Sequence, residues 1–277
     1  METDLPVTDE AVRTTIDDQV ATITINRPRK LNAINGAVIS AMSEALDRVE
    51  ADDDVRVVVI TGAGKNFSAG YDIANSSVVA SEDSAQAHRF LSAEAALTMK
   101  LWALNKPTIA AVDGWCLAGG FDTVLACDMV VATERAQFGM PEIRYGSGPV
   151  TLLLPYMLGH KLSNEIFFTG DSFPAERALQ LGLVNRVVPD DALESSVQAL
   201  ADKVKPTPLP ILKFTKLGLL RAYESMGLRQ GVQANLDLSA ILNKAITEEG
   251  AEFFRIVQAE GLGAALKWRD ARYGAKL

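Results

Sequence analysis

Hydrophobic and polar residues follow two different periods near the start of the chain. Two alternating runs, 11–16 and 19–25, flank a pair of aspartates and predict a β-hairpin. From about Gly36, apolar residues recur every three or four positions, as they do along one face of a helix. A continuous apolar run at 55–61 then predicts a buried strand. The first quarter of the chain is therefore predicted to be strand, strand, helix, strand.

The same patterns continue until about Lys205, after which only helical spacing remains. Strands are predicted at 108–112, 129–132 and 184–188, with a turn at 169–174. Helices are predicted at 86–104, 150–158, 161–168, 175–181 and 190–204, and in the final part at 209–226, 228–246 and 263–273. Because prolines at 206–210 separate the two parts, we predict an α/β unit over 1–205 and a helical region over 206–277.

The stretch 106–146 combines a strand, a glycine pair and two acids. Its apolar opening is followed by Gly119-Gly120, where a helical pattern begins, and then by Asp122 and Glu142. The first N–H groups of a helix have no partner within it, so they can hold a developing negative charge. Two acids nearby can serve as general acid and base. The combination is expected for enolate chemistry at a carbonyl or thioester, although the same residues alone also fit a tight turn beside two solvated acids.

A second glycine-rich loop, 62–73, follows the strand predicted at 55–61. A loop after a buried strand is a usual place for ligand contacts. The dinucleotide fingerprint needs a glycine where the chain has Phe67. A P-loop needs a glycine in place of Val59, and a serine or threonine in place of Asn66. Neither nucleotide motif is therefore present in this loop.

The overall composition is that of an ordinary globular protein, with 48% hydrophobic and 22% charged residues among 277. A formal net charge of −8 argues against a general nucleic-acid surface. The two cysteines, Cys116 and Cys127, lie in apolar surroundings and are predicted to be packed in the core. They offer no disulfide framework, which indicates a reducing compartment, and the acidic N-terminus lacks an apolar signal segment. We therefore expect a cytoplasmic protein.

Three further classes of site lack their sequence signatures. Aspartates and glycines interrupt the most apolar stretch, 108–132, which falls short of the roughly 20 apolar residues of a membrane helix. The chain has only two histidines and no cluster of histidine and cysteine, which argues against a zinc site. No GxSxG motif occurs, so the commonest serine-hydrolase signature is missing. We therefore predict neither a membrane segment nor a bound metal.

Five segments spread along the chain form a recognisable set. They are NRPRKLNAIN (26–35), ITGAGKNFSAGYDI (60–73), KPTIAAVDGWCLAGGFDTVLACD (106–128), FGMPEIRYG (138–146) and LGLVNRVVP (181–189). In this order they resemble the crotonase, or enoyl-CoA hydratase/isomerase, superfamily from about Val12 to Arg272. The resemblance implies an α/β spiral of repeated ββα units followed by a C-terminal helical trimerisation region. It also implies self-association, as a homotrimer or a dimer of trimers.

The resemblance places an active site in the middle of the chain. Family members hold the thioester oxygen with two backbone N–H groups, which fall at Tyr71 and Gly119. Hydratases of the family add two glutamates, of which one matches Glu142. The other position is occupied by Asp122, whose side chain is one methylene, about 1.5 Å, shorter. Because catalytic groups tolerate displacements of only about 0.5 Å, we expect this change to slow hydration unless the backbone adjusts.

The resemblance leaves the reaction open between several alternatives. We favour a 2-enoyl-CoA hydratase that acts through a stabilised thioester enolate. A Δ3,Δ2-enoyl-CoA isomerase needs only the acid at Glu142, which is present. A dienoyl-CoA isomerase resembles the chain at Asp122 but has a further acid where this chain has Val150. A non-catalytic protein that binds acyl-CoA or RNA is the remaining alternative, and the net charge disfavours RNA.

The substrate implied by the resemblance is an acyl-CoA thioester, with no organic cofactor or metal. The family binds CoA through backbone groups of two loops and through basic side chains near the phosphates. The matching positions are Lys30, Ala33, Ser68, Ala69, Asp72, Ile73 and Arg269.

Overall fold

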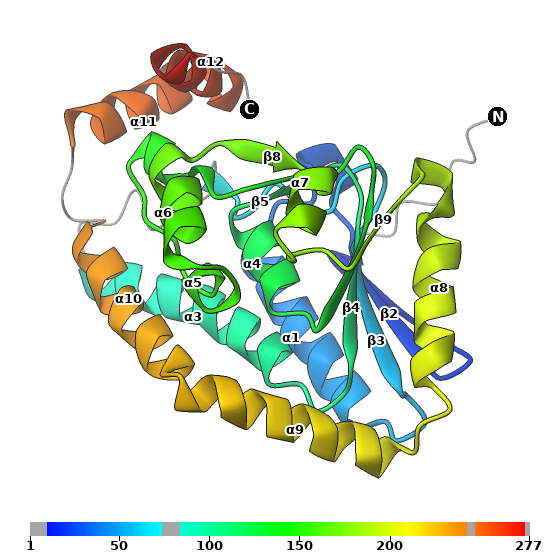
Figure 1. Cartoon of the computed structure of the whole chain (residues 1–277). Helices are drawn as coiled ribbons and strands as arrows, with labels where there is room; N and C mark the ends of the chain where they lie inside the picture. Colours follow the sequence, from blue (N-terminus) through cyan, green and yellow to red (C-terminus); the bar gives the residue numbers. More distant parts are fainter. Residues whose placement is uncertain (1–9, 74–83, 243–246, 275–277) are drawn as a thin grey trace.

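The computed structural model describes residues 10–73, 84–242 and 247–274, and its β-branched runs form a main sheet (Figure 1). In spatial order the strands are β1 (Val12–Asp17), β2 (Val20–Ile25), β3 (Val57–Gly62), β4 (Thr108–Val112), β6 (Met129–Thr133) and β9 (Arg186–Val188). β1 and β2 form an antiparallel hairpin, and all other neighbours run parallel. The hairpin and the later strands are confirmed, the last of them shorter than predicted.

A second, smaller sheet was not predicted from the sequence. It contains β5 (Trp115–Leu117), β7 (Gln137–Gly139) and β8 (Ser172–Pro174). Strands of three residues are too short to show a period, and β8 lies within the predicted turn at 169–174. Isolated bridges between Ile34 and Tyr71, and between Ser68 and Cys116, continue this layer toward the start of the chain. The loops that carry the predicted site are therefore held in strand-like pairings.

The two central repeats of the chain each contribute a strand to each sheet and then a helix or turn. β4 is followed by β5 and α4 (Gly119–Leu125), and β6 by β7 and the 3-10 helix η3 (Pro141–Tyr145). The chain thus advances through two sheet layers before it returns along a helix, which confirms the predicted spiral of ββα units. The remaining elements before residue 205 are η1 (Pro28–Lys30), α1 (Gly36–Ala51), α3 (Ser84–Trp102), α5 (Leu154–Met157), α6 (His160–Thr169), α7 (Ala175–Gln180), η4 (Asp190–Ala192) and α8 (Leu193–Val204).

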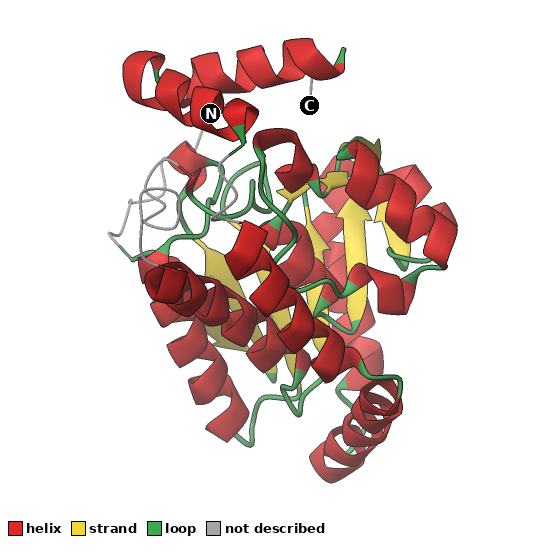
Figure 2. Ribbon diagram, turned by 90° about the vertical axis from the view of Figure 1, so that its left-hand side faces the viewer, coloured by secondary structure: helices red, strands yellow, loops and turns green. Residues whose placement is uncertain are grey.

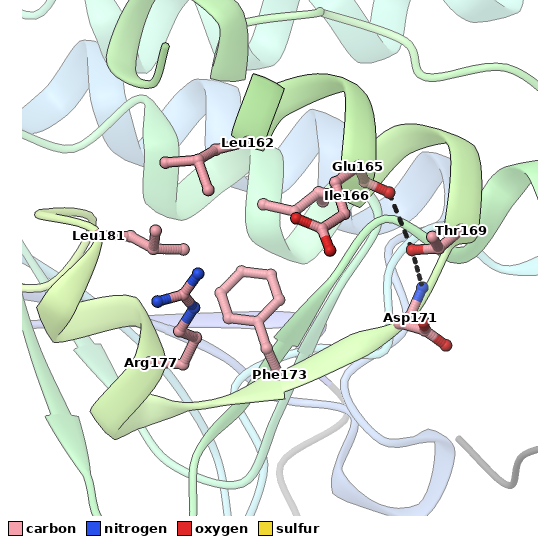
Figure 3. Close-up of a pocket in the computed structure, with 8 residues that line it drawn as sticks. All are labelled: Leu162, Glu165, Ile166, Thr169, Asp171, Phe173, Arg177 and Leu181. Atoms are coloured by element: carbon pink, nitrogen blue, oxygen red, sulfur yellow. Dashed lines mark hydrogen bonds between the residues drawn. The ribbon is translucent and has the colours of Figure 1, made fainter. Parts of the chain in front are cut away.

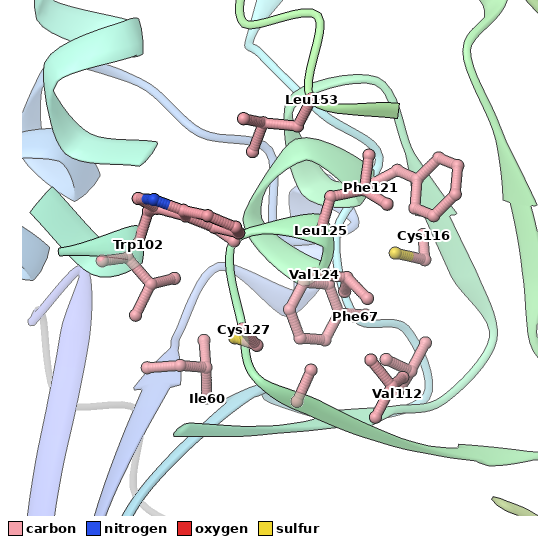
Figure 4. Close-up of a cluster of buried hydrophobic side chains, with 14 of the residues drawn as sticks. Ile60, Phe67, Trp102, Val112, Cys116, Phe121, Val124, Leu125, Cys127 and Leu153 are labelled. Carbon is pink, nitrogen blue, oxygen red and sulfur yellow. The ribbon is translucent and has the colours of Figure 1, made fainter. Parts of the chain in front are cut away.

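The main sheet is covered by helices on both faces, which explains its continuous apolar strands. In β3, Val58 and Ile60 face the core beneath α1, α3 and α4, while Val57 and Val59 face α8. Figure 1 shows α8 on the opposite side of the sheet from α1. The larger core contains the aromatic and aliphatic side chains drawn in Figure 4, with Phe67 and Phe121 fully buried. α4 runs through this core, and all seven of its residues are buried.

The helix predicted at 150–158 is wrong except for the four residues of α5. The residues before it form a loop in which Leu152 has a positive φ of 51°. The Asn235 side-chain amide donates hydrogen bonds to the carbonyls of Pro149, at 2.7 Å, and Val150, at 2.9 Å. These tertiary hydrogen bonds hold the loop open, and the helix begins only where Pro155 occupies its first turn.

The C-terminal helices are α9 (Leu209–Ser225), α10 (Leu228–Leu242), α11 (Glu248–Glu260) and α12 (Leu262–Tyr273). α9 and α10 lie along the core, where the Tyr223 ring packs edge-on against Trp102 with ring centroids 5.2 Å apart. α11 was not predicted; it pairs with α12 around a small core of Phe253, Ile256 and Ala265. Figure 2 shows this pair at one end of the molecule. Residues 1–9, and 243–246 of the predicted helix 228–246, lie outside the described part.

Candidate active site

A sharp turn between β5 and α4 forms one wall of the site. Ala118 has φ 49° and ψ −125°, a conformation that costs energy for a residue other than glycine and that is found mainly at functional sites. Its N–H donates to the Gly139 carbonyl at 2.9 Å, which anchors the turn to β7. Within the described residues no acceptor is found for the N–H of Gly119, the first residue of the helix. The strained turn therefore presents an unbonded N–H group at the start of α4.

The loop after β3 forms the facing wall. Gly70 has φ 94°, and a Cβ atom on it would lie 2.7 Å from the Ala118 Cβ, so the two walls touch. The next residue, Tyr71, places its ring directly on Gly119, because a Cβ atom there would lie 2.4 Å from the ring carbon Cε2. The Tyr71 N–H also has no acceptor among the described residues. The structure thus brings together the two predicted backbone donors, Tyr71 and Gly119.

The two predicted acids come from α4 and η3, and both are buried. Asp122 lies in the first turn of α4 with no exposed surface, and Glu142 follows Pro141 in η3 and is 6% exposed. All four of their carboxylate oxygens lack a hydrogen-bond partner within the described residues. Unpartnered buried carboxyl groups are costly, because desolvation is not repaid by any hydrogen bond. Such groups are typical of sites that complete their contacts with a ligand.

Burial separates the acidities of the two carboxyl groups. It raises the pKa of Asp122 to about 6, and Thr151 nearby partly opposes this rise without reaching regular hydrogen-bond geometry. Burial, followed by the charge of Asp122, raises the pKa of Glu142 to about 8. Two acids whose environments push their pKa values apart can divide the roles of base and acid. Near neutral pH, Asp122 is ionised and Glu142 keeps its proton.

A third carboxyl group, Glu94 on α3, reaches the same site and was missed in the sequence. It is 3% exposed. Burial raises its pKa well above the usual range, and the charges of Asp122 and Glu142 add to this rise. A signal was present, because Glu94 falls on the apolar face of its helix, between Phe90 and Leu97 at helical spacing.

The residues predicted to bind CoA through backbone groups lie on two adjoining loops. The Ala69 N–H donates to the Leu31 carbonyl at 2.9 Å, and the Ser68 hydroxyl donates to the Asn32 carbonyl at 2.9 Å. The loop of Lys30 and Ala33 is thereby joined to the loop of Ser68, Ala69, Asp72 and Ile73. Lys30 is exposed at the end of η1.

Two charged candidates on this list are engaged by other side chains. Asp72 forms an ion pair with Arg27 at 2.9 Å, and so helps to hold the two loops together. Arg269 lies on α12, is 4% exposed and pairs with the neighbouring Asp270 at 2.7 Å. No contact found in the described part of the chain joins Arg269 to Lys30. Its assignment to CoA binding stays a prediction.

Both cysteines are buried in the core, as predicted. Burial raises the pKa of Cys127 to about 12 and that of Cys116 well above its usual value. Neither thiol therefore forms a thiolate near neutral pH, and neither fits a nucleophilic role. Figure 4 shows both sulfur atoms among apolar side chains.

A surface pocket lies between α6, β8 and α7 (Figure 3). Its lining residues are Leu162, Glu165, Ile166, Thr169, Asp171, Phe173, Arg177 and Leu181. None of the three buried acids contributes to it. The unpaired carboxyl groups, and not this depression, identify the candidate active site.

Within 10–73, 84–242 and 247–274, no three histidine, cysteine, aspartate or glutamate side chains are placed to share a metal ion. None of the helices in these ranges is both long and apolar enough to cross a bilayer.

Comparisons with known proteins agree with this fold. Residues 15–255 match the family model of enoyl-CoA hydratase/isomerase. The chain is 33% identical to a short-chain-enoyl-CoA hydratase of Clostridium acetobutylicum, over 75% of this chain and 80% of that protein. It is 37% identical to a carnitinyl-CoA dehydratase of Salmonella enteritidis, over 80% of this chain and 84% of that protein.

A solved structure shows the same architecture. An enoyl-CoA hydratase/isomerase from Xanthobacter autotrophicus Py2 superimposes with a TM-score of 0.92 at 37% identity, covering 95% of this chain and 98% of that one. The spiral of ββα units, the C-terminal helices and the family match over most of the sequence lead to one conclusion. This chain belongs to the enoyl-CoA hydratase/isomerase, or crotonase, family of acyl-CoA-processing enzymes.

Proposed function

We propose that this protein is a 2-enoyl-CoA hydratase, which adds water across the double bond of an acyl-CoA thioester. The observation that carries the proposal is the pair of buried, unpartnered carboxyl groups, Asp122 and Glu142, on the elements beside two unbonded backbone N–H groups. A relative that shares a third of the sequence is itself a short-chain-enoyl-CoA hydratase.

The N–H groups of Tyr71 and Gly119 hold the thioester oxygen in this proposal. When water adds to the β-carbon, negative charge moves onto that oxygen and forms an enolate. Donors fixed before the reaction need no reorganisation, and removal of one such donor typically costs about 3 kcal/mol. The strained turn at Ala118 supports this role, because it fixes the direction of the Gly119 N–H.

The two acids divide the proton transfers. Asp122, ionised near neutral pH, takes a proton from water as the water oxygen bonds to the β-carbon. Glu142, still protonated, gives its proton to the α-carbon of the enolate. The proton gained by Asp122 then restores Glu142, so that one water molecule is added and the enzyme is unchanged. No electron carrier takes part, and the CoA thioester is substrate and not cofactor.

The remaining assignments are also part of the proposal. CoA lies against the joined loops of Lys30, Ala33, Ser68, Ala69, Asp72 and Ile73, with Lys30 and Arg269 facing phosphate groups. The protein works in the cytoplasm as a homotrimer or a dimer of trimers, and uses neither nucleic acid nor a membrane as partner. Large apolar side chains exposed on α9 and α10 support self-association, namely Ile211, Phe214, Leu219, Leu238 and Ile241. Light scattering tests this assembly, and a stable monomer would contradict it.

Double-bond isomerisation is the second candidate. The observation in its favour is the short side chain of Asp122, which suits a supporting role better than the activation of water. In that case Glu142 alone shuttles a proton between two carbons.

Two substrates separate these candidates. Crotonyl-CoA loses its conjugated thioester absorbance on hydration, whereas a 3-enoyl-CoA gains that absorbance on isomerisation. Rapid loss with crotonyl-CoA supports the hydratase; conversion of the 3-enoyl substrate alone would reject it. The Asp122→Asn variant sharpens the comparison, because loss of an acid/base group should slow hydration by about 10²-fold or more and affect isomerisation less.

A further inference from the structure

Glu94 occupies an unusual position for a carboxyl group. Its neighbours on α3, Leu91 and Ala95, belong to an apolar cluster with Val150, Leu236 and Ala240. The Tyr71 side chain packs against the same cluster. Glu94 therefore projects from an apolar wall, at 3% exposure, next to the proposed reacting groups.

The carboxyl group of Glu94 has neither a hydrogen-bond donor nor a basic side chain as a partner among the described residues. Among the described residues no hydrogen bond or ion pair to this carboxyl group is found, and no basic side chain opposes the raised pKa. The Thr98 hydroxyl donates to the Glu94 backbone carbonyl at 3.4 Å, and the Tyr71 phenol lies close enough for the charge of Glu94 to raise its pKa. Burial raises the pKa of Glu94 well above its usual value and so favours the protonated form, whose O–H can donate a hydrogen bond as well as accept one.

A purely structural role does not explain this arrangement. A neutral carboxyl group without a partner is destabilising in an apolar wall, where a leucine would pack without that cost. Elsewhere in the same fold, buried ionisable groups such as Lys106 and Lys216 use their polar atoms in hydrogen bonds. Glu94 lies close enough for the charges of Asp122 and Glu142 to raise its pKa, and we assign the missing partners of those two acids to the substrate.

We propose that Glu94, together with Thr98 and the Tyr71 hydroxyl, hydrogen-bonds an oxygen carried by the acyl group beyond its β-carbon. The preferred substrate is then a short acyl-CoA with a neutral hydroxyl or keto oxygen on its acyl chain. A plain hydrocarbon chain leaves these polar groups unsatisfied, and a carboxylate on the chain is repelled by the ionised Asp122. This inference rests on the proposed function, because it concerns the acyl end of the same site.

Binding of unreactive thioesters tests the proposal without relying on turnover. Butyryl-CoA and 4-hydroxybutyryl-CoA lack the double bond and differ by one oxygen, so titration calorimetry measures that oxygen alone. We expect wild type to bind the hydroxylated thioester at least about 10-fold more tightly, because sites built to bond a hydroxyl discriminate strongly against its absence. Equal affinity for the two thioesters would overturn the proposal.

Substitutions of Glu94 test whether this residue causes the preference for 4-hydroxybutyryl-CoA over butyryl-CoA. Glu94→Leu should abolish the preference and bind butyryl-CoA as well as wild type or better, whereas Glu94→Gln should keep much of it. Glu94→Met serves in place of the leucine variant if that protein does not fold. A preference that survives in both apolar variants would overturn the proposal.

Turnover separates binding from a role in proton transfer. With crotonyl-CoA, any effect of Glu94→Leu should appear in KM and not in kcat, because Glu94 is proposed to contact the acyl chain and not the reacting carbons. A large loss of kcat at unchanged thioester affinity would identify Glu94 as an acid/base group and reject the proposal. If wild type hydrates no enoyl-CoA but still prefers 4-hydroxybutyryl-CoA, the hydratase assignment fails while the assignment of Glu94 stands.

Discussion

Two groups of ionisable side chains lie at the two ends of α4, and they are built in opposite ways. Beyond the end of the helix, the Asp128 carboxylate accepts hydrogen bonds from the Thr108 N–H at 2.7 Å and from Lys216 at 2.8 Å. Lys106 donates to the carbonyls of Val49 and Asp52. At the start of the helix, the carboxylate oxygens of Asp122 have no partner.

This difference in hydrogen bonding shows that one fold can use ionisable groups either to join its elements or to supply a reactive site. The paired network around Asp128 fastens α9 and β4 to β6, and its hydrogen bonds offset the desolvation of its charges. The acids of the site receive no such compensation, so their pKa values rise and their oxygens stay available. Burial alone does not distinguish a structural group from a catalytic one; the presence of partners does.

The largest expected effect comes from Glu142→Gln. Removal of the proton donor should lower kcat for crotonyl-CoA hydration by about 10³-fold, within the range of general acid catalysis. Chromatography of the hydrated product measures the loss. Glu165→Gln, an exposed change on α6, is the matched control and should retain wild-type activity. Activity of Glu142→Gln near the wild-type level would remove this residue from the mechanism.

Gly119→Ala tests the close contact between the two walls. The new methyl group would lie 2.4 Å from the Tyr71 ring, so either this ring or the turn at Ala118 must move. The movement would separate the N–H groups of Tyr71 and Gly119. We expect kcat to fall by about 10²-fold, as it does when one oxyanion donor is lost. Gly218→Ala on α9, where the added atom meets nothing within 4 Å, provides the control. Unchanged kinetics in Gly119→Ala would show that this turn does not hold the substrate oxygen.

The pH dependence of kcat/KM should be bell-shaped, with its limbs near pH 6 and pH 8. Below about 6, Asp122 becomes protonated and no longer serves as a base; above about 8, Glu142 loses the proton that it must donate. On each limb the rate should change about tenfold per pH unit. In Asp122→Asn the acidic limb should disappear while the alkaline limb remains. A flat profile between pH 5 and 9 would contradict the proposed division of roles.

The smallest expected effects concern stability and have opposite signs in the two groups. Lys216→Met should lower stability by about 1–3 kcal/mol, because Asp128 loses a buried partner. Glu142→Gln should instead raise the melting temperature at pH 8. The pKa of Glu142 is higher in the folded protein than in the unfolded chain, so its contribution to stability falls as pH rises from about 4.5 to about 8. Thermal denaturation at pH 5 and pH 8 measures both effects, and destabilisation by both variants would contradict the comparison.

Much of the fold could be predicted because its signals are local. Long apolar strands and helices show their periods in the sequence, and the glycines around the turn at Ala118 mark where two backbones touch. The three-residue strands β5, β7 and β8 carry no period, so the second sheet could not be found in this way. The failed helix before α5 has a different cause, because hydrogen bonds from the distant Asn235 determine the loop.

Part of the candidate site could also be predicted, because some of its residues lie in local sequence motifs. Asp122 and Glu142 lie inside motifs that resemble a known family, and the structure places both beside the paired loops. Glu94 lies in no motif, and only its position on an apolar helix face distinguishes it in the sequence. Which acids meet, and which of them lack partners, depends on packing between α3, α4 and η3, and that packing is tertiary information.

The link between α10 and the loop opposite Asp122 has a consequence for the whole assembly. α10 holds Pro149 and Val150 through Asn235, while the adjoining part of its surface exposes Leu238 and Ile241. In the proposed trimer, burial of the exposed face would restrain the helix and, through it, the loop that carries Thr151. Subunit association and substrate affinity are then thermodynamically linked, so that each strengthens the other by the same factor. Such an enzyme would lose specific activity on dilution before its subunits unfold.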